Sequence, residues 1–216
     1  YIGKLRRYVV NDFDFMKRED PIYNHIKNHS STLKMINAKI KRGEESSRKA
    51  LIKRNSLNVV PIYTANENLY FRIDTPSYYI EKRNIEKDFY HNEKIGLNIT
   101  FRNRIKCCYV GKEYCLKSII CIYNLPHEQL LDLLLLYNSR LFDYFHFIGY
   151  SYFFEKRSNV IWDMYNYPYF QFPDYLRFIC ELLIDSYNED MHSLLEIILY
   201  VHIFKIKNNI LSIVES

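Results

Sequence analysis

The sequence predicts an α+β protein, in which a small mixed β-sheet or a partly open barrel is followed by a helical C-terminal half. Two observations support this class. Short runs rich in Ile, Val, Tyr and Phe recur about every ten residues between positions 57 and 123, and turn residues separate them. After Pro126, Leu and Phe recur at helical spacing and form a broad apolar face. We therefore expect strands first and helices second.

Residues 1–31 are polar and mixed, and we expect them to form a helix or linker that leads into the folded part. Asp20-Pro21 is a typical helix start, and His29-Ser30-Ser31 is a typical break.

The next run, up to Gly43, has two interpretations that stay open. Leu33, Ile36 and Ile40 recur at near-helical spacing, whereas Ile36, Ala38 and Ile40 alternate as in a strand.

The strand-like runs define a β-rich segment, residues 32–124, which we expect to be one domain. The predicted strands cover residues 57–63, 69–73, 78–81, 95–102, 105–110 and 118–123.

Residues 125–216 are the predicted helical part, which we expect to pack on the β-rich domain and on a partner domain. Pro126 suits a first helical position, and further amphipathic helices are expected over residues 175–186 and 192–206. Asn138-Ser139 interrupts the first apolar helix, so we expect these two side chains to cap or bend it.

The charge is distributed unevenly along the chain. Residues 1–106 hold 22 Lys and Arg against 12 Asp and Glu, whereas residues 107–216 hold 8 against 13. A positive half joined to a negative half is typical of a protein in which one half binds a polyanion and the other half faces a different molecule or domain. Chance clustering on a Lys-rich chain is the alternative.

The sequence contains no complete catalytic or metal-binding pattern. Its five Gly are isolated, which excludes a glycine-rich nucleotide cradle, and no nucleophile elbow or HExxH motif is present. The five Cys include an adjacent pair and lack CxxC spacing, which favours buried, reduced thiols in the cytoplasm over a metal site. The longest apolar run is broken by Asp132, Arg140 and Asp143, so we expect no membrane span. We expect no cofactor in this chain.

The most informative stretch is basic and contains Gly43. Lys or Arg side chains that neutralise phosphates would bind DNA, and Gly43 would let the backbone turn and approach closely. Ser46 and Ser47 could donate hydrogen bonds to phosphate. A solvated helical face is the alternative. Between positions 34 and 54 the basic residues are Lys34, Lys39, Lys41, Arg42, Arg48, Lys49, Lys53 and Arg54.

The order of motifs resembles the target recognition domains of type I specificity subunits and type IIG restriction–modification enzymes. Residues 32–43, Thr-Leu-Lys-Met-Ile-Asn-Ala-Lys-Ile-Lys-Arg-Gly, resemble the opening of those domains, and Lys94-Ile95 resembles a later strand start. Residues 133–141, Leu-Leu-Leu-Leu-Tyr-Asn-Ser-Arg-Leu, are similar to the family's helix that bears Leu-Leu-Asn-Ser-Lys-Leu. The resemblance covers roughly residues 32–213, and the methyltransferase motifs and nuclease segment of the complete enzymes are absent.

The resemblance implies sequence-specific recognition of double-stranded DNA, with a methyltransferase or nuclease partner supplied by another domain or subunit. It implies candidate phosphate contacts and, on strands that face the major groove, candidate base readers. A protein–protein interaction or scaffolding domain with an incidental basic face is the alternative. A third is an enzyme whose site is assembled from scattered residues. The phosphate candidates are Lys41, Arg42, Ser46, Ser47, Arg48 and Lys49, and the base readers are Arg72, Arg102, Asn103 and Arg104.

Overall fold

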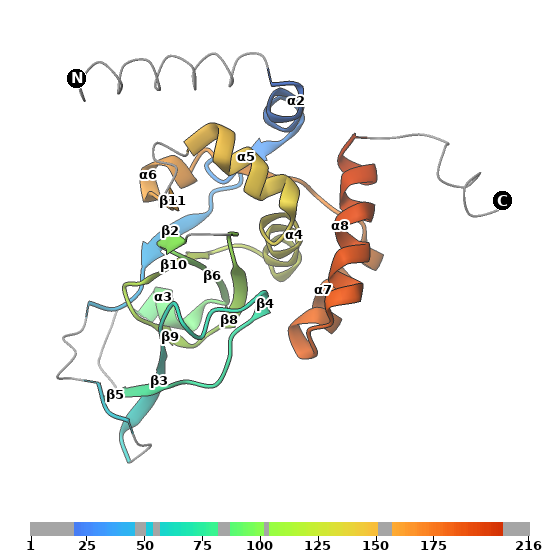
Figure 1. Cartoon of the computed structure of the whole chain (residues 1–216). Coiled ribbons are helices and arrows are strands. Elements are labelled where there is room, and N and C mark those ends of the chain that lie inside the picture. Colours follow the sequence, from blue (N-terminus) through green and yellow to red (C-terminus); the bar gives the residue numbers. More distant parts are fainter. Residues whose placement is uncertain are drawn as a thin grey trace, which may run out of the picture.

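The computed structural model describes residues 20–45, 51–53, 57–81, 87–101, 104–150 and 157–204. It confirms the predicted class: small mixed sheets come first, and helices are concentrated in the C-terminal half (Figure 1).

The first described helix, α2 (Pro21–His29), begins and ends where the sequence predicts. The Asp20 carboxylate accepts a hydrogen bond from the backbone N–H of Tyr23 at 2.6 Å, which caps the helix start. At the other end Ser30 adopts an extended conformation and stops the helix. The rest of the predicted leading segment, residues 1–19, lies outside the described residues.

The open question about residues 32–43 is decided in favour of strands. After β1 (Ser31–Thr32) the chain turns through Asn37, whose φ is 58°, and then forms β2 (Lys39–Arg42). The N–H of Ala38 donates to the Leu33 carbonyl at 3.0 Å and closes this turn. The helix-like spacing of Ile36 therefore comes from a turn.

A five-stranded sheet forms the centre of the fold, in the order β2-β10-β6-β8-β4. Its β4–β8 pair is parallel and its other pairs are antiparallel. Beside β2, the strands are β4 (Phe71–Arg72), β6 (Lys94–Asn98), β8 (Cys107–Gly111) and β10 (Ile119–Tyr123).

Every residue of β10 is buried because both faces of this sheet are covered. Ile120 and Ile122 belong to the main hydrophobic cluster, together with residues of the helices. The alternate residues of β10, Cys121 and Tyr123, belong to a smaller cluster with Phe89. Successive side chains of a strand point to opposite faces, so the two clusters lie on the two faces of the sheet.

The helices that follow are α4 (His127–Tyr137), α5 (Arg140–Tyr150), α7 (Asp174–Asp185) and α8 (Glu189–Phe204). The main hydrophobic cluster contains Tyr23, Ile95, Leu134 and Leu199, so the three predicted segments pack on one another through it. The boundaries at residues 31 and 124 stay predictions.

Each predicted strand run contains a strand, although the run 95–102 is divided between β6 and β7 (Thr100–Phe101). The second sheet has the order β5-β3-β9, and two pairs of short strands, β1-β12 and β11-β7, complete the fold. The remaining elements are β3 (Val59–Tyr63), β5 (Tyr78–Glu81), α3 (Lys87–His91), β9 (Tyr114–Cys115), β11 (Arg157–Ser158), α6 (Ile161–Met164) and β12 (Pro168–Tyr169).

The structural role predicted for Asn138 and Ser139 is confirmed. The Asn138 side chain exchanges hydrogen bonds with the backbone of Cys107, at 2.9 Å to its N–H and 2.8 Å to its carbonyl. Ser139 Oγ accepts from the N–H of Phe142 at 3.2 Å and so caps the start of α5. The pair therefore ends one helix, starts the next and fixes both to β8.

The thiols of all five Cys are free and buried, as expected for structural Cys. Within the described residues, no helix is both long enough and apolar enough to cross a membrane. The same part of the chain contains no cluster of His, Cys, Asp and Glu that could hold a metal ion.

Candidate nucleic-acid interface

Strand β2 is an edge of the central sheet and carries a row of cations. In the five-stranded sheet it pairs with β10. Ile40 points into the core, while Lys39 and Arg42 are exposed. Lys41 is half-buried, with its Nζ 5.3 Å from the centroid of the Phe89 ring. The strand therefore presents positive charge at an open edge of the sheet.

The chain leaves β2 through Gly43, which is packed against another backbone segment. The Gly43 N–H donates to the Ile119 carbonyl at 3.0 Å. A Cβ at this position would overlap the carbonyl oxygens of Cys115 and Leu116. The backbone at Gly43 thus makes a close approach to the protein's own turn before β10, and an approach to DNA at this point stays a prediction.

Two backbone hydrogen bonds fix the residues after Gly43 to the same turn. The N–H of Glu44 donates to the Cys115 carbonyl at 2.6 Å, and the N–H of Lys117 donates to the Glu44 carbonyl at 2.9 Å. The end of β2 and Lys117 are therefore neighbours.

Beyond this junction lies a groove of about 740 Å³ with a mixed polar and apolar lining, which we call the Lys53–Lys117 groove. Ser118 Oγ accepts from the Ala65 N–H at 3.1 Å, which joins two of its walls. Lys117 lies 3.6 Å from Glu45, and with side-chain exposures of 58% and 83% this pair is weak. Such a groove offers cations and hydroxyl and amide groups to a phosphodiester backbone. Its lining residues are Leu51, Lys53, Thr64, Ala65, Asn66, Tyr78, Leu116, Lys117 and Ser118.

Lys94, at the strand start that the motifs singled out, is fully buried. Its Nζ donates to the Gly111 carbonyl at 3.1 Å and lies 5.3 Å from the centroid of the Phe89 ring. Burial lowers the pKa of the Lys94 amine, because it disfavours the charged form. Lys94 is a structural cation, held by a carbonyl and aromatic rings.

The predicted site residues fall into separate parts of the structure. Lys41 and Arg42 lie together on β2. Arg72 is half-buried on β4, at the opposite edge of the same sheet. The structure therefore brings the first two together and places Arg72 apart from them. The predicted residues Ser46, Ser47, Arg48, Lys49, Arg102 and Asn103 lie outside the described residues.

Arg104 has partners within the protein. Its guanidinium pairs with Glu196 of α8 and donates to the Asn138 carbonyl at 3.1 Å. The guanidinium carbon also lies 5.6 Å from the centroid of the Tyr70 ring. These contacts place Arg104 between the sheet and the helices. Its role as a base reader stays a prediction.

The Lys53–Lys117 groove was not recognised as a site from the sequence. It combines three segments, around residues 51–53, 64–66 and 116–118, that are far apart in the chain. Each segment alone has the composition of an ordinary turn, so no local signal marks them. Only the basic character of Lys53 is visible in the sequence.

No protein-family model matches the chain, and no curated protein matches its sequence. Its structure is similar to part of the type IIG restriction endonuclease BpuSI, with a TM-score of 0.56 and 11% identity over 82% of this chain and 28% of that chain. The HsdS subunit from Thermoanaerobacter tengcongensis aligns with a TM-score of 0.46 and 10% identity, over 93% of this chain and 53% of that chain. The type I restriction-modification S subunit from M. genitalium aligns with a TM-score of 0.36 and 12% identity, over 93% and 53%.

The chain thus spans less than a third of BpuSI and about half of the two S subunits. At 11% identity the likeness to BpuSI concerns the fold alone. In its fold the chain resembles a segment of a type IIG restriction endonuclease, as its ordered motifs predicted.

Proposed function

We propose that this chain recognises a specific sequence of double-stranded DNA, as the specificity domain of a restriction–modification system. The observation that carries the proposal is the exposed cationic edge of β2, which continues into the Lys53–Lys117 groove. The fold supports it, because a type IIG restriction endonuclease contains a similar one.

The β-rich segment, residues 32–124, is the part that binds DNA in this proposal. The phosphates are bound by Lys41, Arg42 and the serine-containing stretch after them. These contacts give affinity for DNA but do not distinguish one base sequence from another. Arg72 and residues 102–104 choose the bases, since Arg and Asn make paired hydrogen bonds with guanine and adenine. The Lys53–Lys117 groove adds further phosphate contacts to this set.

The helical part, residues 125–216, faces a partner domain or subunit that supplies methyltransferase or nuclease activity. In Figure 1, α7 and α8 lie on the opposite side of the molecule from β2. Apolar side chains of both helices are exposed, as is usual where a partner covers a helix. These side chains are Tyr175, Phe178 and Leu182 on α7, and Leu194, Ile197 and Tyr200 on α8.

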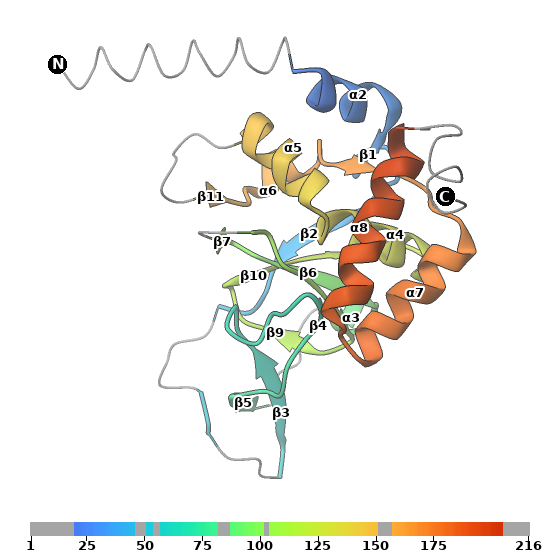
Figure 2. The same ribbon diagram turned by 45° about the vertical axis from the view of Figure 1, so that its right-hand side comes forward.

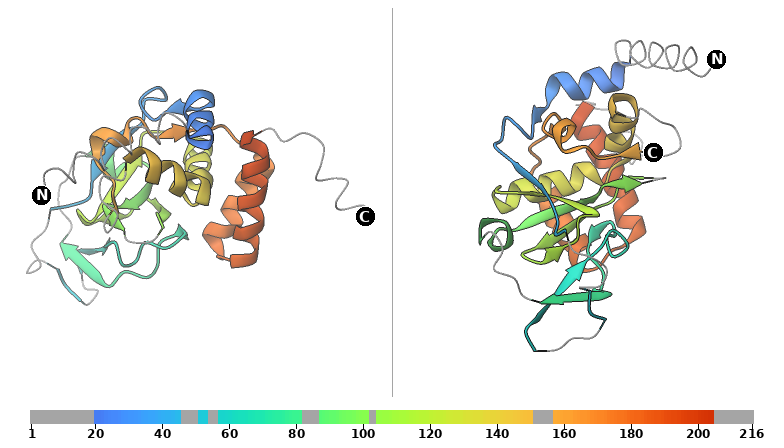
Figure 3. Two further views of the ribbon diagram at one scale, coloured as in Figure 1. Left: turned by 45° about the horizontal axis from the view of Figure 1, so that its top comes forward. Right: turned by 90° about the vertical axis from the view of Figure 1, so that its left-hand side faces the viewer.

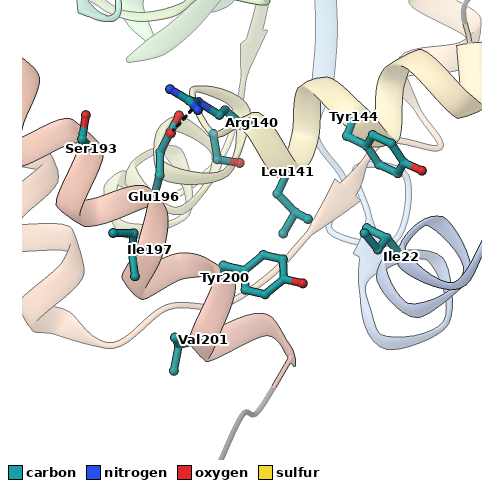
Figure 4. Close-up of a pocket in the computed structure, with 10 residues that line it drawn as sticks. Ile22, Arg140, Leu141, Tyr144, Ser193, Glu196, Ile197, Tyr200 and Val201 are labelled. Carbon is teal, nitrogen blue, oxygen red and sulfur yellow. Dashed lines mark ion pairs between the residues drawn. The ribbon is translucent and has the colours of Figure 1, made fainter. Parts of the chain in front are cut away.

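A pocket of about 730 Å³ between α5 and α8 extends this apolar surface. Figure 4 shows Leu141, Tyr144, Ile197 and Tyr200 around it, with the Arg140–Glu196 ion pair at one end. The exposed apolar surface also favours the second candidate function, a protein–protein interaction domain whose basic face is incidental.

Binding to mixed DNA duplexes at two salt concentrations tests the proposal. We expect binding at low salt and a steep loss of affinity as salt rises, because bound phosphates release their counterions. Absence of binding at low salt, or binding with a flat salt dependence, would reject DNA recognition and leave the interaction domain.

Selection from a random duplex library then separates a sequence reader from a nonspecific binder. A sequence reader enriches one motif, whereas a phosphate binder enriches none. With S-adenosylmethionine and the chain alone, we expect no methyl transfer until a catalytic domain is added.

A further inference from the structure

Trp162 is the one tryptophan of the chain, and it stands in solvent. Its side chain is 82% exposed. Tryptophan is highly buried on average, because water solvates its large apolar ring poorly. An indole this exposed is therefore a candidate contact for another molecule.

The helix that carries Trp162 is firmly attached to the core. In α6, Met164 is fully buried, and Ile161 packs against the main hydrophobic cluster. Just before α6, the Asn159 N–H donates to the Ile99 carbonyl at 2.8 Å, and its side-chain amide donates to the Asn98 carbonyl at 2.7 Å. The indole is thus held outward by a fixed support, so little conformational freedom is lost when it makes a contact.

This support stands beside the cationic edge of the sheet. Helix α6 packs against β2, and the Lys34 N–H donates to the Tyr165 carbonyl at 3.0 Å. Figures 2 and 3 show α6 next to β2 from three directions. Lys34 beside α6 and Lys39 on β2 are both exposed, and the acidic residue of α6, Asp163, is half-buried.

We propose that Trp162 contacts the DNA directly: its indole packs on the sugars and base edges of the duplex while Lys34 and Lys39 pair with the adjoining phosphates. This inference rests on the proposed function and extends the interface beyond the β-rich segment, into the acidic half of the chain. The occupant is DNA because the exposed cations of the segments that pack against α6 favour a polyanion. Aromatic rings beside basic side chains are a recurrent means of contacting nucleic acid.

The single tryptophan makes the contact directly observable. With excitation at the red edge of the indole absorption, where the 21 Tyr hardly absorb, the fluorescence of the full chain reports on Trp162. On titration with a duplex at low salt, we expect quenching of the emission and protection from acrylamide. Free N-acetyltryptophanamide in the same titration controls for absorption by the DNA.

Variants test whether the contact contributes to affinity. Trp162→Ala should weaken duplex binding by about tenfold, which is near the low end of the loss when an aromatic side chain stacked on a single-stranded base is removed. Trp162→Phe keeps a ring and should retain most of the affinity. The matched control is Phe178→Ala, because Phe178 is 60% exposed on α7, away from β2, and should leave binding unchanged. All these side chains are exposed, so the variants should fold.

The outcomes separate this inference from the proposed function. Duplex binding with unchanged emission, or with equal affinity in Trp162→Ala and the parent chain, would overturn the role of Trp162 and leave DNA recognition intact. An equal loss of affinity in Phe178→Ala would also overturn it. If the parent chain binds no duplex at all, the proposed function is rejected, and the role of Trp162 is rejected with it.

Discussion

The guanidinium of Arg104 and the carboxylate of Glu196 form an ion pair at 2.5 Å, which joins the segment before β8 to α8. Glu196 also forms an ion pair with Arg140, with 3.1 Å between the Arg140 Nε and the Glu196 Oε2. The side chains of Arg104 and Glu196 are 28% and 14% exposed, so water screens their attraction only in part. The pair lies between the proposed DNA-binding half and the proposed partner-binding half of the chain.

We expect Glu196→Gln to lower the free energy of unfolding by about 1–2 kcal/mol, because Arg104 and Arg140 lose their counter-charge while staying in place. Urea denaturation measures the change. The control is Glu189→Gln in the first turn of the same helix, where loss of a favourable helix-dipole interaction costs about 0.5 kcal/mol. Equal effects of the two substitutions would show that the ion pair contributes nothing of its own.

Asn138 should be more important to stability than its neighbour Ser139. Asn138→Ala leaves the buried N–H and carbonyl of Cys107 without partners, so we expect a loss of about 2–4 kcal/mol. Ser139→Ala removes a helix cap and should cost about 1 kcal/mol. Urea midpoints in the reverse order would contradict the role assigned to the Asn138 amide.

The sequence predicts a structural feature correctly where neighbouring residues alone indicate it. A polar Asn-Ser pair inside an apolar run indicates a helix boundary wherever it lies in space, and the structure confirms it. The strand runs were recognised because β-branched and aromatic residues cluster in each. In contrast, β9 and β12 are two residues long and pair with strands far away in the chain, as in Ile62 with Tyr114. Two residues contain too little sequence to indicate such a partner strand.

The candidate site was predictable only in part for the same reason. The basic character of β2 is visible in consecutive residues, so the sequence points to Lys41 and Arg42, whose contact with DNA stays a prediction. The ion pair of Arg104 is not visible in the sequence, because its partner Glu196 is 92 positions later in the chain. The exposure of Trp162 depends on how α6 packs, and an aromatic-rich sequence gives a single aromatic residue little weight.

Gly43→Ala should destabilise the junction between β2 and the turn before β10. The added Cβ would meet two backbone carbonyls, which cannot rotate away as a side chain can. We expect a loss of about 2–3 kcal/mol in unfolding experiments, as for other overpacked sites. The control is Glu45→Ala, two residues later, where the side chain is exposed. An unchanged midpoint for Gly43→Ala would mean that the turn moves freely away from β2.

Stability should fall as the solution is acidified, and His192 should contribute to that fall. Burial lowers the pKa of the His192 imidazole below 6.5, and the Arg104 and Arg140 charges act in the same direction, whereas Glu196 and the Asn138 carbonyl oppose it. Near pH 6.5 the unfolded chain therefore binds a proton that the folded chain does not, so the contribution of His192 is present above this pH and is lost as pH falls through it.

Urea denaturation between about pH 7.5 and about pH 5.5 measures this slope. We expect His192→Gln to give a smaller slope than the parent chain, whatever its own stability. Equal slopes in the two proteins would mean that His192 titrates alike in the folded and unfolded states.

Lys39 and Arg42 should set the salt dependence of DNA binding. Both are exposed on β2, at the open edge of the sheet. Each phosphate contact contributes about 0.9 to the slope of log affinity against log salt, so the double variant Lys39→Ala, Arg42→Ala should lower that slope by about 1.8. Fluorescence anisotropy of a labelled duplex over a range of salt concentrations gives the slope.

Lys27→Ala removes an equally exposed cation from α2 and serves as the charge-matched control for this measurement. If Lys27→Ala lowers the slope as much as either β2 substitution, DNA is attracted by the net charge of the protein and not by β2 in particular. If the double variant loses affinity at every salt concentration but keeps the parent slope, the two side chains do not neutralise phosphates. Because phosphate contacts carry no sequence information, the motif selected from a random library should stay the same in the double variant. A changed motif would instead make Lys39 or Arg42 a base reader.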